Sequence, residues 1–207
     1  MDYSIALKGV LIGLSVAAPI GPMSMLTMRR AIERGLSAGL VSGLGIALAD
    51  ATYGAIAAFG LTSLSDVLID YQRFIRIAGG VALLVIAWRI LDQARAPVEA
   101  RPETSRSQGL GRIIGSMYLL TLSNPTTILS FAAIFGGLGL SLGSSTLEST
   151  LLVASVFVGS MIWWFFLCGM LARIRHRLTE TWITRIDLIA GVIILVMAGV
   201  SILSGLR

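Results

Sequence analysis

The sequence predicts an all-α integral membrane protein with six transmembrane helices, arranged as two inverted repeats of three helices. Three observations predict this fold: the composition, the apolar runs, and a proline motif that interrupts the first and the fourth helix. Of the 207 residues, 56% are hydrophobic and 13% are charged, whereas a soluble domain carries about 25% charged residues. The mean hydropathy is +0.87. We therefore expect residues 1–207 to form a single membrane domain.

Six apolar runs are long enough to cross a lipid bilayer. A helix rises about 1.5 Å per residue and must cross about 30 Å of hydrocarbon. The runs that can do so cover residues 4–28, 36–61, 74–91, 113–140, 151–171 and 188–206. The third run spans the bilayer only if Arg76 and Arg89 extend their charged ends toward the two membrane surfaces.

The distribution of arginines predicts the orientation of these helices. Cytoplasmic loops carry an excess of Lys and Arg. Most cations of this chain lie after the first, third and fifth runs, which places both termini on the side of the membrane away from the cytoplasm. The net charge of +5 follows from this topology, so it does not indicate a nucleic-acid partner.

The longest polar stretch divides the chain into two parts. Residues 92–109 contain Pro97 and Pro102, which is typical of a linker, and the arginine distribution places this linker in the cytoplasm. The first repeat would cover residues 1–91 and the second would cover 110–207. Each part has an odd number of helices, so the two parts are predicted to cross the membrane in opposite orientations.

The first run contains the motif Pro19, Gly21 and Pro22. A proline lacks an N–H group and crowds the carbonyl one turn earlier, so it interrupts a helix. In hydrocarbon each unpaired backbone group costs several kcal/mol, and a break persists only inside protein or beside a wet cavity. We therefore predict that this break lines a wet cavity inside the helix bundle.

The fourth run contains a second motif, Ser123, Asn124 and Pro125. Interrupted helices at corresponding positions of two repeats are typical of a transporter whose substrate site lies near the bilayer middle. The alternative is a pair of ordinary proline kinks.

The first break offers an anion site. Proline suits the first position of a helix, so Pro22 would begin a new half-helix whose first N–H groups, at Met23 and Ser24, carry partial positive charge. Ser123 and Asn124 of the second break would add hydrogen bonds. Together these groups are predicted to bind the carboxylate of a small substrate.

Asp50 is the acidic residue nearest the middle of a run, with Tyr53 one turn further on the same helix face. A charge at that depth costs about 2.5–3.5 kcal/mol on insertion scales, so the side chain should face the bundle interior. Three roles remain open: counter-ion to a substrate ammonium group, proton carrier in an antiport cycle, and a protonated acid that only binds a neighbouring helix.

A carboxylate site together with an intramembrane acid describes an amino acid or a related zwitterion. An enzyme is disfavoured, because the runs contain no nucleophile–base pair. We expect no cofactor and no metal, since Cys168 and His176 are the only residues of their types. Two further points stay open: whether Trp163 and Trp164 line a pocket or face lipid, and whether the chain is a monomer or a homodimer.

The motifs resemble those of the LysE/RhtB family of bacterial amino-acid exporters. The resemblance lies in residues 18–22, in residues 35–40 with Gly43, Gly45 and Asp50, and in residues 120–129. It implies a six-helix exporter of amino acids driven by the proton gradient. The sequence departs from the family motif by the extra Ile20 and by Met23 in place of an asparagine. The alternative is an exporter of divalent or other cations with the same superfamily fold.

Overall fold

The computed structural model describes residues 3–19, 21–59, 71–95, 109–124, 127, 130–131, 145–174 and 180–206. All regular elements within these ranges are helical, as predicted. They are α1 (Tyr3–Ala17), α2 (Pro22–Arg34), α3 (Leu36–Ala58), α5 (Gln72–Arg95), α6 (Leu110–Leu122), α8 (Thr146–Ile174) and α9 (Glu180–Leu206).

Three of these helices are long and apolar enough to cross a membrane: α3, α8, and the part of α9 from Thr184. The pair α1 and α2 adds a fourth span if the two helices count as one broken crossing. Another apolar helix, α6, is shorter because it ends at Leu122, and residues 132–140 of the fourth run lie outside the described ranges. The structure thus supports an all-helical membrane protein, and the full set of six spans stays a prediction.

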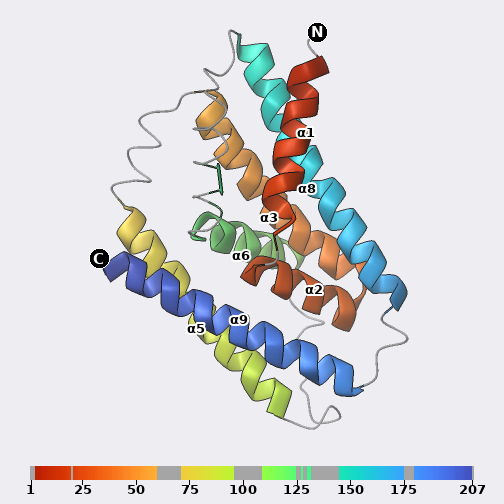
Figure 1. Cartoon of the computed structure of the whole chain (residues 1–207), viewed down its shortest axis with the longest axis vertical. Coiled ribbons are helices and arrows are strands. Elements are labelled where there is room, and N and C mark those ends of the chain that lie inside the picture. Colours follow the sequence, from red (N-terminus) through yellow and green to blue (C-terminus); the bar gives the residue numbers. More distant parts are fainter. Residues whose placement is uncertain are drawn as a thin grey trace.

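The first run is broken at its proline motif, as predicted. Helix α1 ends at Ala17, α2 begins at Pro22, and the two helices differ in direction by 82° (Figure 1). The first predicted span ends at Met28, but this boundary was wrong for the helix. Helix α2 continues to Arg34, so Arg29 and Arg30 are helical. The sharp turn accounts for this difference. Helix α2 does not continue in the direction of α1, so it need not be apolar along its whole length.

Other boundaries also differ from the predicted ones. The connection after α2 is the single residue Gly35, whose φ of 87° lies in the left-handed region that favours glycine. Asp92, the predicted start of the linker, is still inside α5, and residues 96–108 lie outside the described ranges. A helix can extend past its apolar run into charged residues at the membrane surface. A prediction based on apolar residues alone therefore ends the helix too early.

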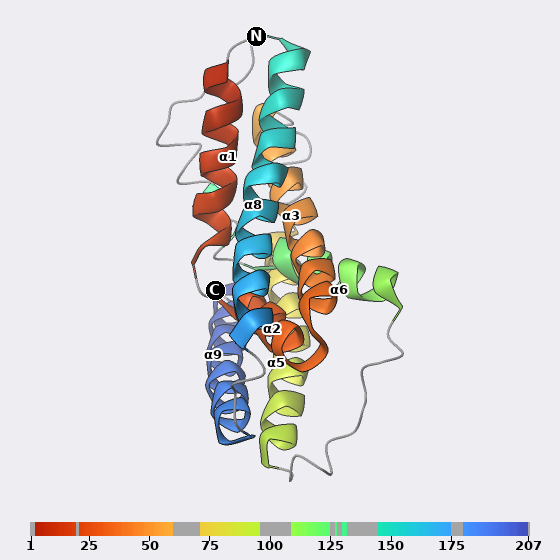
Figure 2. The same cartoon turned by 90° about the vertical axis from the view of Figure 1, so that its right-hand side faces the viewer.

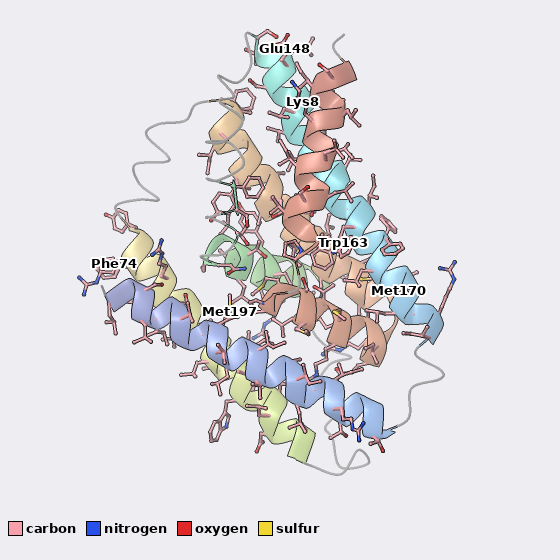
Figure 3. The ribbon with its side chains drawn as sticks, viewed as in Figure 1. Lys8, Phe74, Glu148, Trp163, Met170 and Met197 are labelled. Atoms are coloured by element: carbon pink, nitrogen blue, oxygen red, sulfur yellow. The ribbon has the colours of Figure 1, made fainter. Side chains whose placement is uncertain are left out.

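The helices form two packed groups, with α2 against both. Helix α3 packs against α6 and α8, and α1 packs against α8, while α5 and α9 form an antiparallel pair (Figures 1 and 2). Helix α2 contacts α3 and α8 on one side and α9 on the other. Lys8 of α1 and Glu148 of α8 lie at the same end of the molecule (Figure 3), so α1 and α8 run parallel.

Glycines allow α1 and α8 to approach closely. A Cβ atom on Gly13 would collide with the carbonyl oxygen of Val156, and one on Gly159 would collide with the carbonyl oxygen of Val10. Small residues on both helices bring the two backbones together, which is how helices associate in lipid. By contrast, a Cβ atom on Gly111 or Gly115 of α6 would meet nothing within 4 Å among the described residues.

Large apolar side chains cover the outside of the described helices. Examples are Phe165 and Phe166 on α8 and Val192, Val196 and Val200 on α9, all of them exposed. So large an exposed apolar surface would be unfavourable in water, but it is compatible with the hydrocarbon of a membrane.

Substitution Gly13→Ala is expected to destabilise the protein. The added methyl group would meet the backbone of Val156, and such overpacking costs about 1–3 kcal/mol. Thermal unfolding in detergent should show a lower melting temperature. The matched control is Gly115→Ala, where the new methyl group meets nothing within 4 Å; equal melting temperatures for the two variants would contradict this packing.

Candidate functional site

The first break is stabilised by its own residues. Gly21 is extended and Pro22 takes the first helical position of α2, while the N–H of Met25 donates to the carbonyl of Gly21 at 3.0 Å. The hydroxyl of Ser24 donates to the carbonyl of Pro19 at 3.1 Å. Ser24, predicted to bind substrate, therefore also satisfies an acceptor that the break leaves unpaired.

The start of α2 keeps the character of an anion site. No side chain of the described residues caps it, and the first N–H groups of an α-helix have no partner within the helix. Pro22, Met23 and Ser24 are all buried, so these donors lie inside the protein. The side chain of Met23 packs in the hydrophobic core, so Met23 can contribute to an anion site only through its N–H group.

The second break lies at the end of α6. The hydroxyl of Ser123 donates to the carbonyl of Leu119 at 2.8 Å, and the N–H of Asn124 donates to the carbonyl of Thr121 at 3.1 Å. Pro125 has no N–H group that could pair with the Thr121 carbonyl in a continuous helix. That carbonyl nevertheless has a partner, because Asn124, one residue earlier, donates to it. Asn124 is buried, and Pro125 lies outside the described residues.

Tyr53 connects α3 to this second break. Its hydroxyl donates to the carbonyl of Leu122 at 2.7 Å, and its ring stacks on Phe131 with centroids 5.4 Å apart. Leu122 is the last residue of α6, so its carbonyl lies among those that a helix end leaves without an intrahelical partner. Tyr53 supplies that partner from a different helix.

Asp50 lies in the interior, as predicted for an intramembrane acid. Its side chain is 1% exposed, and its Oδ2 atom accepts a hydrogen bond of 2.7 Å from the hydroxyl of Ser160 on α8. Within the described part of the chain no cation forms an ion pair with it. Asp50 thus retains one carboxyl oxygen for which no protein partner is assigned.

Asp50 and Ser160 belong to a line of close contacts between α3 and α8, which we call the α3–α8 seam. The seam consists of Gly39 against Cys168, Gly43 against Trp164, Asp50 against Ser160, and Gly54 against Val156. A Cβ atom on Gly43 would lie 2.6 Å from the Cβ of Trp164, so the glycine makes room for the indole ring.

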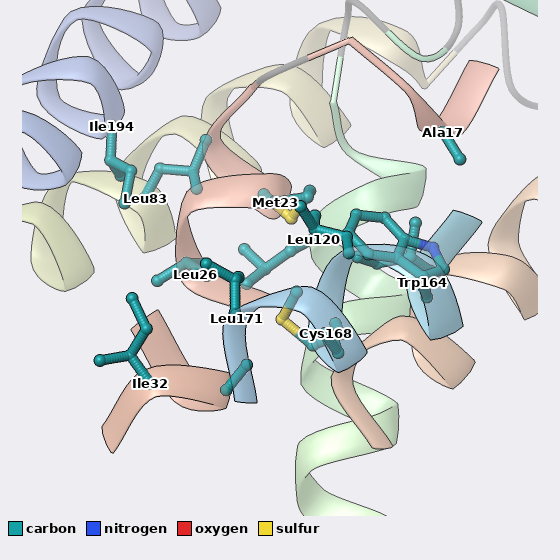
Figure 4. Packing of buried hydrophobic residues seen from close by; sticks show 14 of the residues in the cluster. Ala17, Met23, Leu26, Ile32, Leu83, Leu120, Trp164, Cys168, Leu171 and Ile194 are labelled. Carbon is teal, nitrogen blue, oxygen red and sulfur yellow. The ribbon is translucent and has the colours of Figure 1, made fainter. Parts of the chain in front are cut away.

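The two breaks lie next to each other. Met23, in the first turn of α2, and Leu120, in the last turn of α6, belong to the same buried cluster as Trp164 and lie side by side in Figure 4. Trp164 is one turn from Ser160 along α8, and Asp50 is one turn from Tyr53 along α3. The start of α2, the end of α6 and Trp164 therefore border one region of the core, whereas Tyr53 belongs to a second buried cluster with Phe131 and Val156.

Buried donors without partners mark this region. Trp164 Nε1 and Thr27 Oγ1 have no hydrogen-bond partner among the described residues, although Trp164 is 1% exposed and Thr27 is fully buried. An unsatisfied buried donor costs about 1–3 kcal/mol, so such groups indicate a bound molecule or ordered water. Trp164 is therefore interior, while Trp163 is half-buried and its Nε1 atom also lacks a partner.

Sequence reasoning missed Ser160 and Thr27. Both are small polar residues in helical segments, and hydroxyl side chains are common in membrane helices because they can bind their own backbone. Their spacing could have indicated them. Ser160 lies four residues before Trp164, and Thr27 lies three residues after Ser24. Each therefore shares a helix face with a residue that the sequence analysis named.

Apolar helices with a lipid-compatible outer surface, two adjoining helix breaks and a buried acid define a membrane transport protein. Residues 14–205 match the model of the family described as LysE type translocator. The chain belongs to this family. It is accordingly a transporter and not an enzyme, which confirms both the family resemblance and the expectation that the chain is not an enzyme.

Two bacterial membrane proteins are similar to this chain over most of their length. The "Putative amino acid efflux protein YcgF" of Bacillus subtilis (strain 168) is 27% identical over 195 residues, which cover 93% of this chain and 92% of that protein. The "Uncharacterized membrane protein YahN" of Escherichia coli (strain K12) is 30% identical over 158 residues, 75% of this chain and 70% of that protein. No solved structure gives a significant match.

Substitution Tyr53→Phe is expected to destabilise the protein by about 1–3 kcal/mol, because it leaves the buried carbonyl of Leu122 without its donor. The ring remains and can still stack on Phe131. Thermal unfolding in detergent measures the effect, and Tyr71→Phe at an exposed position before α5 is the control. If both variants unfold at the wild-type temperature, the hydroxyl of Tyr53 does not cap α6.

Proposed function

We propose that this protein is a secondary exporter of an amino acid or a related small zwitterion, a ligand that carries both an anionic and a cationic end, and that protons drive it by antiport. The observation that carries this proposal is the buried Asp50–Ser160 pair between α3 and α8. Ser160 lies one turn before Trp164, which shares a buried cluster with Met23 and Leu120 at the two breaks. One region of the core thus offers donors for a carboxylate and an acid for an ammonium group or a proton.

The carboxylate end would lie at the start of α2. The N–H groups of Met23 and Ser24 begin a buried helix, and the helix dipole adds partial positive charge there. Thr27 and Trp164 supply donors that lack partners among the described residues. Asn124 and Ser123 border the same region from the end of α6, and Pro19, Gly21, Pro22 and Pro125 shape the two breaks.

The other end would lie at Asp50. When the acid is charged, its cost inside the membrane is offset by an ammonium group of the substrate; when it takes up a proton, that cost disappears. Alternation between these two states couples substrate exit to proton entry. Ser160 donates to Oδ2 and orients the carboxyl group for either partner.

The directions of the helices support the proposed topology. Helices α1 and α8 run parallel to each other and α3 runs antiparallel to α8, since Gly39 meets Cys168 and Gly54 meets Val156. These directions agree with six spans in two inverted repeats and with both termini outside the bacterial inner membrane. The name of the Bacillus relative, an amino acid efflux protein, supports the substrate class.

Efflux from loaded proteoliposomes tests the role of Asp50. With a labelled amino acid inside and an imposed proton gradient, Asp50→Asn is expected to abolish proton-driven efflux. If Asp50 carries the proton alone, exchange of labelled for unlabelled amino acid persists in the variant; if it also binds the ammonium group, exchange is lost as well. Asp92→Asn, at an exposed position near the end of α5, is the matched control.

Wild-type rates in Asp50→Asn would remove this residue from the mechanism. Vesicles loaded with a divalent cation distinguish the alternative substrate class. Cation efflux that depends on Asp50, in the absence of amino-acid efflux, would overturn the zwitterion proposal.

Substitution Trp164→Phe is expected to weaken substrate binding by about tenfold, the effect of losing one hydrogen bond to a charged group, while the ring still fills the space beside Gly43. The half-saturation concentration for exchange measures it. Trp88→Phe on the exposed face of α5 should leave that concentration unchanged. An unchanged value in Trp164→Phe would show that the indole N–H does not contact substrate.

A further inference from the structure

A second buried acid lies outside the proposed binding region. Asp187, near the start of α9, is 1% exposed, and its Oδ1 atom lies 3.1 Å from Nε of Arg29 on α2. An acid buried to this degree is costly unless it is paired. The predicted apolar run began one residue later, at Leu188, and so excluded it.

Arg29 and its neighbour Arg30 fasten α2 to two different helices. Arg29 binds Asp187 of α9 and also Glu33 on its own helix, at 2.8 Å. Arg30 donates through Nη1 to the hydroxyl of Ser42 on α3, at 3.0 Å. Helix α2 is thus held on one side by an ion pair and on the other by a hydrogen bond.

Helix α2 covers one end of the α3–α8 seam. A Cβ atom on Gly39 would lie 2.7 Å from Sγ of Cys168 and 2.8 Å from Cβ of Ala31. Ala31 belongs to α2, and both it and Cys168 are fully buried. The thiol is therefore enclosed where α2, α3 and α8 meet, and movement of α2 away from α3 would uncover it.

The other end of α2 follows a glycine. Gly21, directly before α2, is extended, and a Cβ atom on it would meet no atom of the described residues within 4 Å. The binding groups proposed above, at Met23, Ser24 and Thr27, all belong to α2. Rotation of this helix would therefore move the site and open the seam together.

We infer that the Arg29–Asp187 ion pair is a latch that holds α2 closed over the α3–α8 seam, and that its release opens this end of the substrate path. Arg29 and Asp187 are positioning residues, since they act through α2. The part of the inference that concerns the substrate path rests on the proposed function, whereas the latch itself does not.

The native Cys168 reports the position of α2. Protein reconstituted in liposomes is treated with N-ethylmaleimide, a small membrane-permeable thiol reagent, and mass spectrometry follows the reaction of the cysteine. The wild type is expected to react slowly. Asp187→Asn should react at least about tenfold faster, because loss of one partner of a buried ion pair favours the open population.

Charge exchange separates a latch from general damage to the fold. The single variants Arg29→Asp and Asp187→Arg should both react fast, and the double variant should return toward the wild-type rate because the pair forms again with reversed charges. Glu33→Gln is the matched control, since it removes the other acid bound to Arg29 and leaves Asp187 in place. Its rate should stay within about twofold of the wild type.

Wild-type reaction rates in Asp187→Asn, or no recovery in the double variant, would overturn the latch. Arg29→Lys provides the test if a charge-reversed protein does not fold: it keeps the charge but lacks the Nε atom of the pair, so its rate should lie between those of the wild type and Asp187→Asn. Fast labelling together with unaltered proton-driven efflux would overturn the link to the substrate path and leave the proposed exporter function intact.

Discussion

Every backbone group of a helix that is broken inside a membrane must find a partner within the protein, because hydrocarbon offers none. This constraint organises the described part of the chain. At the first break the hydroxyl of Ser24 binds the carbonyl of Pro19, and at the second break the hydroxyl of Tyr53 binds the carbonyl of Leu122. Each break is therefore supported by a hydrogen bond from a side-chain hydroxyl to a backbone carbonyl.

The same constraint explains why polar chemistry gathers in one region. Once two interrupted helices meet, as Met23 and Leu120 do, their ends bring donors and acceptors into a core that is otherwise apolar. In the proposed site, the Asp50–Ser160 pair and the indole N–H of Trp164 would bind the same ligand. A transporter needs such a polar region because a charged solute does not enter the hydrocarbon of the membrane by itself.

Much of this arrangement could be predicted from local sequence. The helix break at Pro19, Gly21 and Pro22 follows from the chemistry of proline, and the burial of Asp50 follows from the cost of an exposed charge in lipid. The direction of α2 could not be predicted, because an 82° turn depends on what the helix packs against. Asp187 was missed for a related reason: its partner, Arg29, is distant in sequence, and only tertiary structure shows that the acid is enclosed.

The pairing of α1 with α8 has a consequence for how the protein is made. The glycines of α1 fit against a helix that is synthesised much later, after the whole of the first proposed repeat, and α5 likewise depends on α9. Both early helices must therefore remain in the membrane without their final neighbours while translation continues. Assembly of the bundle can finish only when the last helices arrive, so the two repeats are expected to be interdependent during biogenesis and not to mature as separate halves.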